Sequence, residues 1–80
     1  MMNKNHAHYY KSVAHLDSID VCRVLDLFNV TNPCLQHAAK KILCAGARGN
    51  KDFEKDVREA IDSLNMALQM IAEDCNEKSA

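Results

Sequence analysis

The side chains most able to do chemistry are four basic residues near the middle of the chain, around its only two glycines. They are Lys40, Lys41, Arg48 and Lys51, with Gly46 and Gly49 between them. Glycine allows backbone angles that other residues rarely adopt, so we expect a tight turn between two helices here. The helix that begins after the turn presents unpaired N–H groups beside the cations, and both favour phosphate or carboxylate. Residues 36–52 therefore predict an anion-binding turn.

A second interpretation of this stretch requires no ligand. Lys40 and Lys41 lie in the last turn of the expected helix, where cations complement the helix dipole, and Arg48 is then simply solvated. The G-A-R-G spacing also differs from the G-x-x-x-x-G-K-[ST] phosphate-binding loop and follows a helix instead of a strand. P-loop kinase chemistry is therefore not supported.

Aromatic and imidazole side chains supply further candidate ligand contacts. Tyr9 and Tyr10 can stack against a ligand or cover the end of the helical core. His37 and Gly49 lie within the basic stretch and complete the predicted ligand-binding set. The H-x-H pair at His6 in the leader is interpreted as a feature of a polar tail, and we predict neither a metal site nor a cofactor.

Acidic side chains follow on the third expected helix. Asp56, Glu59 and Asp62 are spaced so that their carboxylates share one helical face. All-α nucleotide pyrophosphohydrolases use such faces to hold magnesium, but they need more acids on a second helix. The second helix here carries lysines instead, so ion pairs with Lys55, Arg58 or the basic turn are favoured over a metal site.

The cysteines show no metal-binding pattern. Cys22, Cys34, Cys44 and Cys75 are separated by 12, 10 and 31 positions, without a C-x-x-C pair. No run approaches the roughly 20 apolar residues that a membrane span needs, and the N-terminus lacks the apolar core of a secretory signal. We expect a cytoplasmic protein with reduced thiols.

Three helices are expected to position these side chains. The first begins at Asp17 or Ser18 and ends near Phe28, because either residue can cap a helix whose apolar positions follow at helical spacing. A break at 29–33 ends in a proline suited to the first position of the second helix, with Asn32 or Thr31 as the cap. The third helix is expected from about 53 to 75. The predicted fold is all-α, with a flexible polar leader at 1–16, one three-helix domain at 17–75 (two short helices and one long C-terminal helix) and a frayed tail at 76–80.

Apolar spacing also predicts which faces are covered. On the second helix the buried stripe is expected to contain Leu35, Ala38, Ala39, Ile42 and Leu43. On the third helix an a/d seam is formed by Val57, Ile61, Leu64, Leu68, Ile71 and Cys75. A second apolar strip, Met66, Ala67 and Met70, lies beside that seam and predicts a subunit interface. An 80-residue chain buries only a small core, which also favours a homo-oligomer through the long helix.

Charge is distributed unevenly along the chain. The formal net charge is −1, which excludes a strong overall attraction to nucleic acid. Residues 40–58 hold six basic and three acidic side chains, a local +3, so the other residues sum to −4. The middle of the chain is therefore the surface best suited to an anionic partner.

The order of these motifs resembles the small SaV-like family of bacteriophage proteins. The resemblance covers roughly residues 8–70 and is carried by His8–Tyr9–Tyr10, by Ile19–Asp20–Val21, by the runs 36–43 and 45–49, and by the acidic helix at 51–64. It implies a phage-encoded, all-helical protein located in the host cytoplasm. Some relatives carry a nucleotide-kinase label, which the residues of this chain do not support, and the segment before the first helix departs from the family's glycine-containing entry.

Two classes of function follow from these patterns. In the first, the chain is a non-enzymatic protein that captures a phosphorylated small molecule, such as a nucleotide signal of host antiviral defence. In the second, it is a phage accessory protein whose basic face docks on a host protein or on nucleic acid. A pyrophosphohydrolase-like enzyme is the third and weakest interpretation.

Overall fold

The fold consists of helices joined by loops of different lengths. A computed structural model describes residues 4–47 and 49–79. A 3-10 helix, η1 (Lys4–Tyr9), precedes three α-helices, α1 (Val21–Leu27), α2 (Pro33–Leu43) and α3 (Asn50–Ser79). The described residues contain no strand, which confirms the predicted all-α class with two short helices and one long C-terminal helix. No described helix combines the length and apolar character that a membrane span requires.

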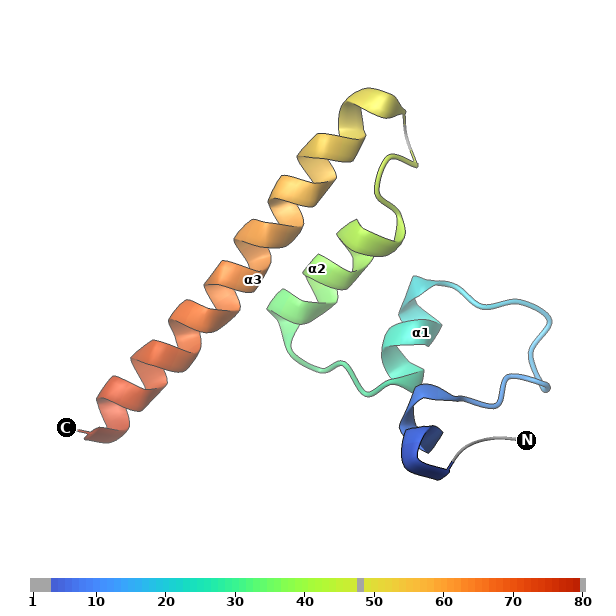
Figure 1. The fold of residues 1–80 in the computed structure, drawn as a ribbon, viewed down its shortest axis with the longest axis horizontal. Coiled ribbons are helices and arrows are strands. Elements are labelled where there is room, and N and C mark those ends of the chain that lie inside the picture. The colour runs from blue at the N-terminus through green and yellow to red at the C-terminus, as the bar shows by residue number, and fades with distance from the viewer. Residues whose placement is uncertain (1–3, 48, 80) are drawn as a thin grey trace.

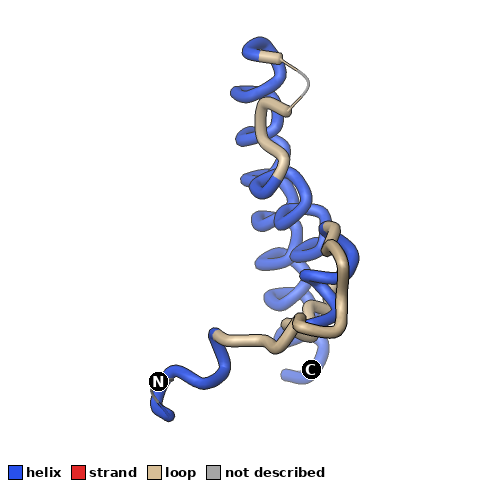
Figure 2. The backbone as a smooth tube through the Cα atoms, turned by 90° about the vertical axis from the view of Figure 1, so that its right-hand side faces the viewer, coloured by secondary structure: helices blue, strands red, loops and turns tan. Residues whose placement is uncertain are grey.

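The three α-helices lie in a row, with α2 between α1 and α3 (Figure 1). Among the described residues α2 packs against both neighbours, whereas α1 and α3 do not pack against each other. The radius of gyration is 16.2 Å, well above the about 12 Å expected for a compact domain of this length. Seen from the side, η1 projects away from the helices (Figure 2). Each helix therefore keeps broad surfaces open to solvent.

Helix α1 begins later than predicted. Asp20, and not Asp17 or Ser18, is the N-cap, because its carboxylate accepts a hydrogen bond from the N–H of Arg23 at 2.9 Å. Three capping residues lie within four positions, and the sequence alone does not say which of them the chain uses. The helix is seven residues long and ends before Asn29, which adopts a left-handed φ of 57°.

Helix α2 begins where the sequence predicts. Asn32 is the N-cap, and its side-chain oxygen accepts hydrogen bonds from the N–H groups of Cys34 at 2.9 Å and Leu35 at 3.1 Å. Pro33 occupies the first helical position, where its missing N–H has no consequence. The side-chain amide of Gln36 donates to the carbonyl of Val30 at 2.8 Å and so fastens the connection from α1 to the body of α2.

The packing face of α3 differs from the predicted seam. The buried residues of α3 are Asp56, Ala60 and Ala67, at spacings of four and seven, and together they form one stripe. The larger residues of the predicted a/d seam are exposed instead, namely Val57, Ile61, Leu64, Leu68 and Ile71. On α2, Ala38 is buried as predicted, whereas Leu35, Ile42 and Leu43 are exposed.

The predicted subunit strip of Met66, Ala67 and Met70 also contains both buried and exposed residues. Ala67 is buried within the chain itself, so it is not an exposed member of a subunit interface. Met66 and Met70 are exposed. Small residues let the backbones of two helices approach closely, which explains why the stripe of Ala60 and Ala67 is covered by α2 and the seam of larger side chains is not.

Candidate functional site

Lys41 does not face solvent as a free cation. Its Nζ lies 2.9 Å from Oε1 of Glu59 and 3.5 Å from Oδ1 of Asp56. The hydrogen bond with Glu59 raises the pKa of Lys41 and lowers the pKa of Glu59. The other oxygen of Asp56, Oδ2, accepts the N–H of Gly46 at 3.2 Å. The anionic groups beside Lys41 and the turn are therefore carboxylates of the chain itself.

Two of the acidic residues on α3 form the kind of ion pair that the sequence predicts. Asp56 and Glu59 are both paired with Lys41, a lysine of the basic stretch. Within the described residues no group of three His, Cys, Asp or Glu side chains could hold a metal ion. Glu59 Oε1 is shielded from solvent, and the ammonium of Lys41 offsets its charge.

The N–H groups in the described part of the turn after α2 are bonded within the chain. Gly46 and Gly49 have φ values of 75° and 131°, so both adopt the predicted positive angles. However, the N–H groups of Cys44, Ala47 and Gly49 donate to the carbonyls of Lys40, Cys44 and Gly46. The N–H of Gly46 is taken by Asp56. The described part of the turn is thus saturated by internal acceptors and leaves no N–H group for a bound anion.

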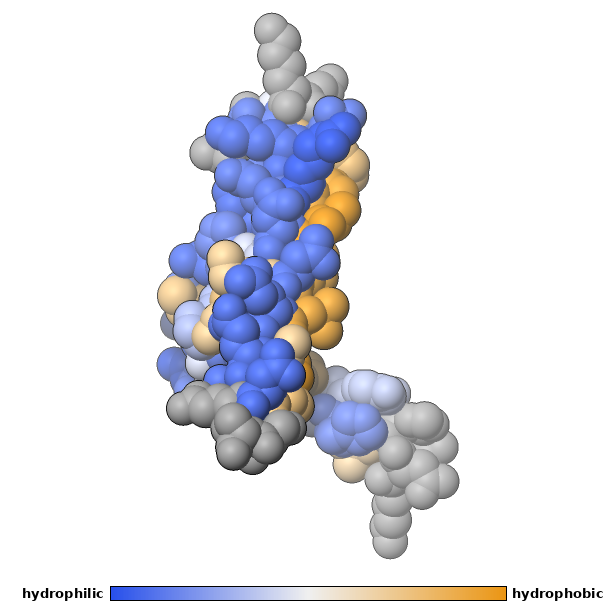
Figure 3. Space-filling model, turned by 90° about the vertical axis from the view of Figure 1, so that its left-hand side faces the viewer, coloured by the Kyte–Doolittle hydropathy of each residue, from blue (hydrophilic) through white to orange (hydrophobic). Residues whose placement is uncertain are grey.

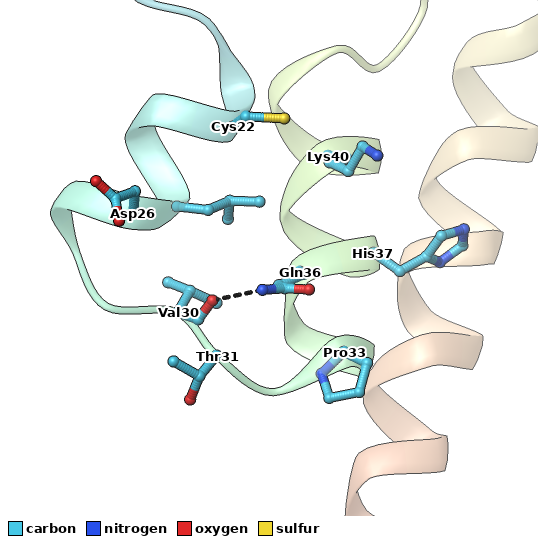
Figure 4. A pocket seen from close by; sticks show the side chains of 9 residues that line it. Cys22, Asp26, Val30, Thr31, Pro33, Gln36, His37 and Lys40 are labelled. Atoms are coloured by element: carbon cyan, nitrogen blue, oxygen red, sulfur yellow. Dashed lines mark hydrogen bonds between the residues drawn. The ribbon is translucent and has the colours of Figure 1, made fainter.

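Lys40 has a different environment from its neighbour. It is exposed and has no ion-pair partner among the described residues. It lines two adjoining hollows, of about 450 and about 400 Å³, and His37 lines both with it. The larger hollow, the α1–α2 cleft, lies between α1 and α2. Cys22 points toward α2, Asp26 lies on the outer side of α1, and the side chains of Lys40 and His37 point toward α3 (Figure 4). Lys40 is therefore a free cation at the junction of two concave surfaces.

His37 joins this site to α3. Its Nδ1 lies 2.5 Å from the hydroxyl of Ser63, which holds the imidazole between the two helices. If the hydroxyl donates to Nδ1, the neutral ring carries its proton on Nε2. The ring then presents an N–H donor in addition to the ammonium of Lys40, and both groups suit an anionic ligand.

Besides Lys40 and His37, the α1–α2 cleft is lined by one acid and by apolar or neutral side chains. Asp26 lines it, but its carboxylate lies 3.9 Å from the guanidinium of Arg23, so part of its charge is offset outside the cleft. The remaining walls are formed by Cys22, Leu25, Val30, Thr31, Pro33 and Gln36. An apolar wall with a few polar groups is typical of sites that bind small molecules.

The predicted ligand-binding residues are not gathered in one place. Tyr9 and Tyr10 are exposed at η1, which lies at the end of the molecule opposite the turn after α2 (Figures 1 and 2). The ring of Tyr9 packs against that of His8, with centroids 4.1 Å apart. The predicted contacts of Arg48 and of the Lys51 side chain lie outside the residues that the structure describes. Of the predicted set, Lys40 and His37 line the cleft together.

Sequence reasoning missed the residues that α1 contributes. Cys22 and Asp26 are not among the predicted ligand-binding residues, because nothing in their spacing indicates that α1 packs beside Lys40. The signal that was available is the short connection at 28–32, which requires α1 and α2 to be neighbours. No family model, curated protein or solved structure matches this chain.

Proposed function

We propose that this chain is a non-enzymatic binding protein that captures a small phosphorylated molecule in the α1–α2 cleft. The observation that carries the proposal is the unpaired ammonium of Lys40 at the junction of two hollows. A phosphate group bound there would receive a charge-assisted hydrogen bond from Lys40 and one N–H donor from His37. The rest of the ligand would lie against the apolar wall of the cleft.

The size of the cleft supports a ligand larger than free phosphate. Its volume of about 450 Å³ falls within the roughly 300–1,000 Å³ of small-molecule sites. A nucleotide combines a phosphate with a flat, largely apolar base. The phosphate would lie beside Lys40, and the base would lie against the apolar residues of the cleft. We therefore propose a nucleotide as the ligand class, and a nucleotide signal of host antiviral defence as the specific member. The resemblance to SaV-like bacteriophage proteins is the support for a phage origin and an action in the host cytoplasm.

The other functional interpretations have weaker support. A pyrophosphohydrolase would need Asp56 and Glu59 to hold magnesium, and both carboxylates are paired with Lys41. Docking on nucleic acid through a basic face would need several free cations, and Lys41 is neutralised within the chain. Docking on a host protein stays a sequence-based alternative.

Calorimetric titration of the parent chain and two lysine variants tests the proposal. The ligand panel contains inorganic phosphate, nucleoside monophosphates and cyclic dinucleotides. Lys40→Ala is expected to weaken binding of the best ligand by about 1.5–3 kcal/mol, or roughly ten- to a hundredfold, because a hydrogen bond to a charged group is lost. Lys55→Ala is the matched control, since Lys55 is an exposed lysine on α3 that lines neither hollow.

The titration has two outcomes that contradict the proposal. One is that no member of the panel binds the parent chain. The other is that Lys40→Ala and Lys55→Ala weaken binding equally, which would mean that only overall charge matters. A thermal-shift measurement provides an independent check, because a ligand at a hundred times its Kd adds about 2.7 kcal/mol to the free energy of unfolding.

A further inference from the structure

The interior of this chain is too small to account for its helices. The buried apolar residues among those described are Leu25, Ala38, Ala60 and Ala67, so three of the four are alanines. Helix α3 has 30 residues, or about 45 Å, whereas α2 has 11 residues, or about 16 Å. Because α3 packs on α2 alone, much of its length has no packing partner within the described chain. In proteins, most of the stability of a helix comes from packing of its apolar face rather than from helix propensity.

One surface of the molecule is broad and apolar. We call it the α2–α3 face and define it by Leu35 and Ile42 on α2 and by Phe53, Val57, Ile61, Leu64, Leu68 and Ile71 on α3. The exposed fractions of these eight side chains range from 38% to 64%. A groove of about 320 Å³ lies at the end of this face near the turn between α2 and α3. It is lined by residues of both helices, including Ile42, Phe53 and Ile61. The space-filling view shows hydrophobic side chains gathered along one edge beside a hydrophilic surface (Figure 3).

The spacing within this face favours another helix as its cover. Val57, Ile61, Leu64, Leu68 and Ile71 repeat at intervals of four, three, four and three, which is the heptad pattern of helices that wind around each other. Leu35 and Ile42 are seven positions apart, so they lie on the same side of α2 and widen the face to two helices. A surface two helices wide fits a second pair of helices better than a single peptide.

Charge and area favour a second copy of this chain over a different protein. The face itself contains no charged residue, and its flank carries the ion pair of Glu54 and Arg58, at 3.4 Å, which is neutral as a pair. An identical flank is therefore not repelled. A standard interface buries about 800 Å² per partner, which requires a broad surface such as these eight exposed apolar side chains on two helices. A second copy is also present wherever the chain is made, so the face need not be left uncovered.

We infer that the α2–α3 face is a two-fold interface between two copies of this chain, which packs two helical pairs face to face into a four-helix bundle. The interface differs from the strip of Met66 and Met70 that the sequence predicts. It leaves the proposed ligand cleft accessible, because Lys40 and His37 lie on the side of α2 turned away from Ile42. The inference stands independently of the proposed ligand.

Sedimentation equilibrium at micromolar concentration tests this interface with a matched pair of variants. The parent chain is expected to have twice the 9.0 kDa mass of one copy. Ile61→Glu places a charge in the centre of the face and is expected to raise the dimer Kd by about a hundredfold or more, because burial of an unpaired charge is unfavourable. Met66→Glu makes the same change at an exposed position on another side of α3 and is expected to leave the mass unchanged.

Melting of the parent chain over a concentration series keeps the inference testable if Ile61→Glu fails to fold. The melting temperature and helical circular dichroism signal are expected to fall on dilution, because the folded dimer is favoured by mass action. A parent mass of 9.0 kDa with a melting temperature independent of concentration would overturn the inference. Equal dissociation by Ile61→Glu and Met66→Glu, or a larger assembly unaffected by Ile61→Glu, would also overturn it. Loss of the dimer without loss of nucleotide binding would separate this interface from the proposed function.

Discussion

Two adjacent lysines show that the environment of a residue determines whether its charge is paired within the chain or free to bind a ligand. Lys40 and Lys41 are equivalent in a sequence motif, but one helical position rotates the side chain by 100°. That rotation places Lys41 against Asp56 and Glu59 and places Lys40 at the edge of the cleft. The sequence identifies a region rich in basic residues, because charge composition is local information. The sequence does not show which lysine forms an ion pair within the chain, because the acidic partners belong to another helix.

The ion pair between Lys41 and Glu59 predicts a dependence of stability on pH. The pKa of Glu59 is lowered in the folded chain, so the unfolded chain binds more protons in acid and the contribution of Glu59 is present above its ordinary pKa of 4.5. This contribution is expected to disappear as pH falls through the lower pKa of the folded state. Urea unfolding at pH 7 and at pH 3 therefore should show a destabilising effect of Glu59→Gln that is smaller at the lower pH.

Glu54→Gln is the control for this measurement. Glu54 and Arg58 form an exposed ion pair one helical turn apart, and such pairs contribute little to stability. The variant is expected to unfold at nearly the same urea concentration as the parent at both pH values. An effect of Glu59→Gln that does not change with pH would show that Glu59 acts through packing and not through its charge.

The helix boundaries show which features a sequence can predict. The start of α2 follows from Asn32 and Pro33, and the turn follows from Gly46, because each signal lies within a few residues of the structure it directs. The packing face of α3 does not follow from its own pattern. Periodicity identifies the most apolar side of a helix, whereas a partner helix with lysine at position 41 packs best against the side that holds Asp56 and Ala60.

Replacement of Asn32, the N-cap of α2, tests directly whether this residue fixes the start of the helix. Asn32→Ala deprives the N–H groups of Cys34 and Leu35 of their acceptor and is expected to lower the free energy of unfolding by about 1 kcal/mol. Asn65→Ala, at an exposed position in the middle of α3, is the matched control and should leave stability unchanged or slightly raised. Chemical denaturation that shows the same loss for both variants would remove Asn32 from its role as the cap.

At the scale of the whole molecule, the helices form a row with two different sides. The α2–α3 face is apolar and suited to a second copy, and the opposite side of α2 carries Lys40, His37 and the cleft with α1. Neither side could be predicted from the sequence as a unit, because each combines residues from two helices whose relative placement is tertiary. The predicted set Tyr9, Tyr10 and Lys40 is divided for the same reason, since η1 projects away from the helices.

Amide chemical shifts of the ¹⁵N-labelled chain, followed during titration with a cyclic dinucleotide and with the nucleoside monophosphates, test binding at Lys40 most directly. The expected result is a set of saturable shifts at residues 36–40 of α2 and 22–26 of α1, which disappears in Lys40→Ala and persists in Lys55→Ala. The contradicting result is either no shift with any phosphorylated ligand or shifts confined to residues outside the α1–α2 cleft.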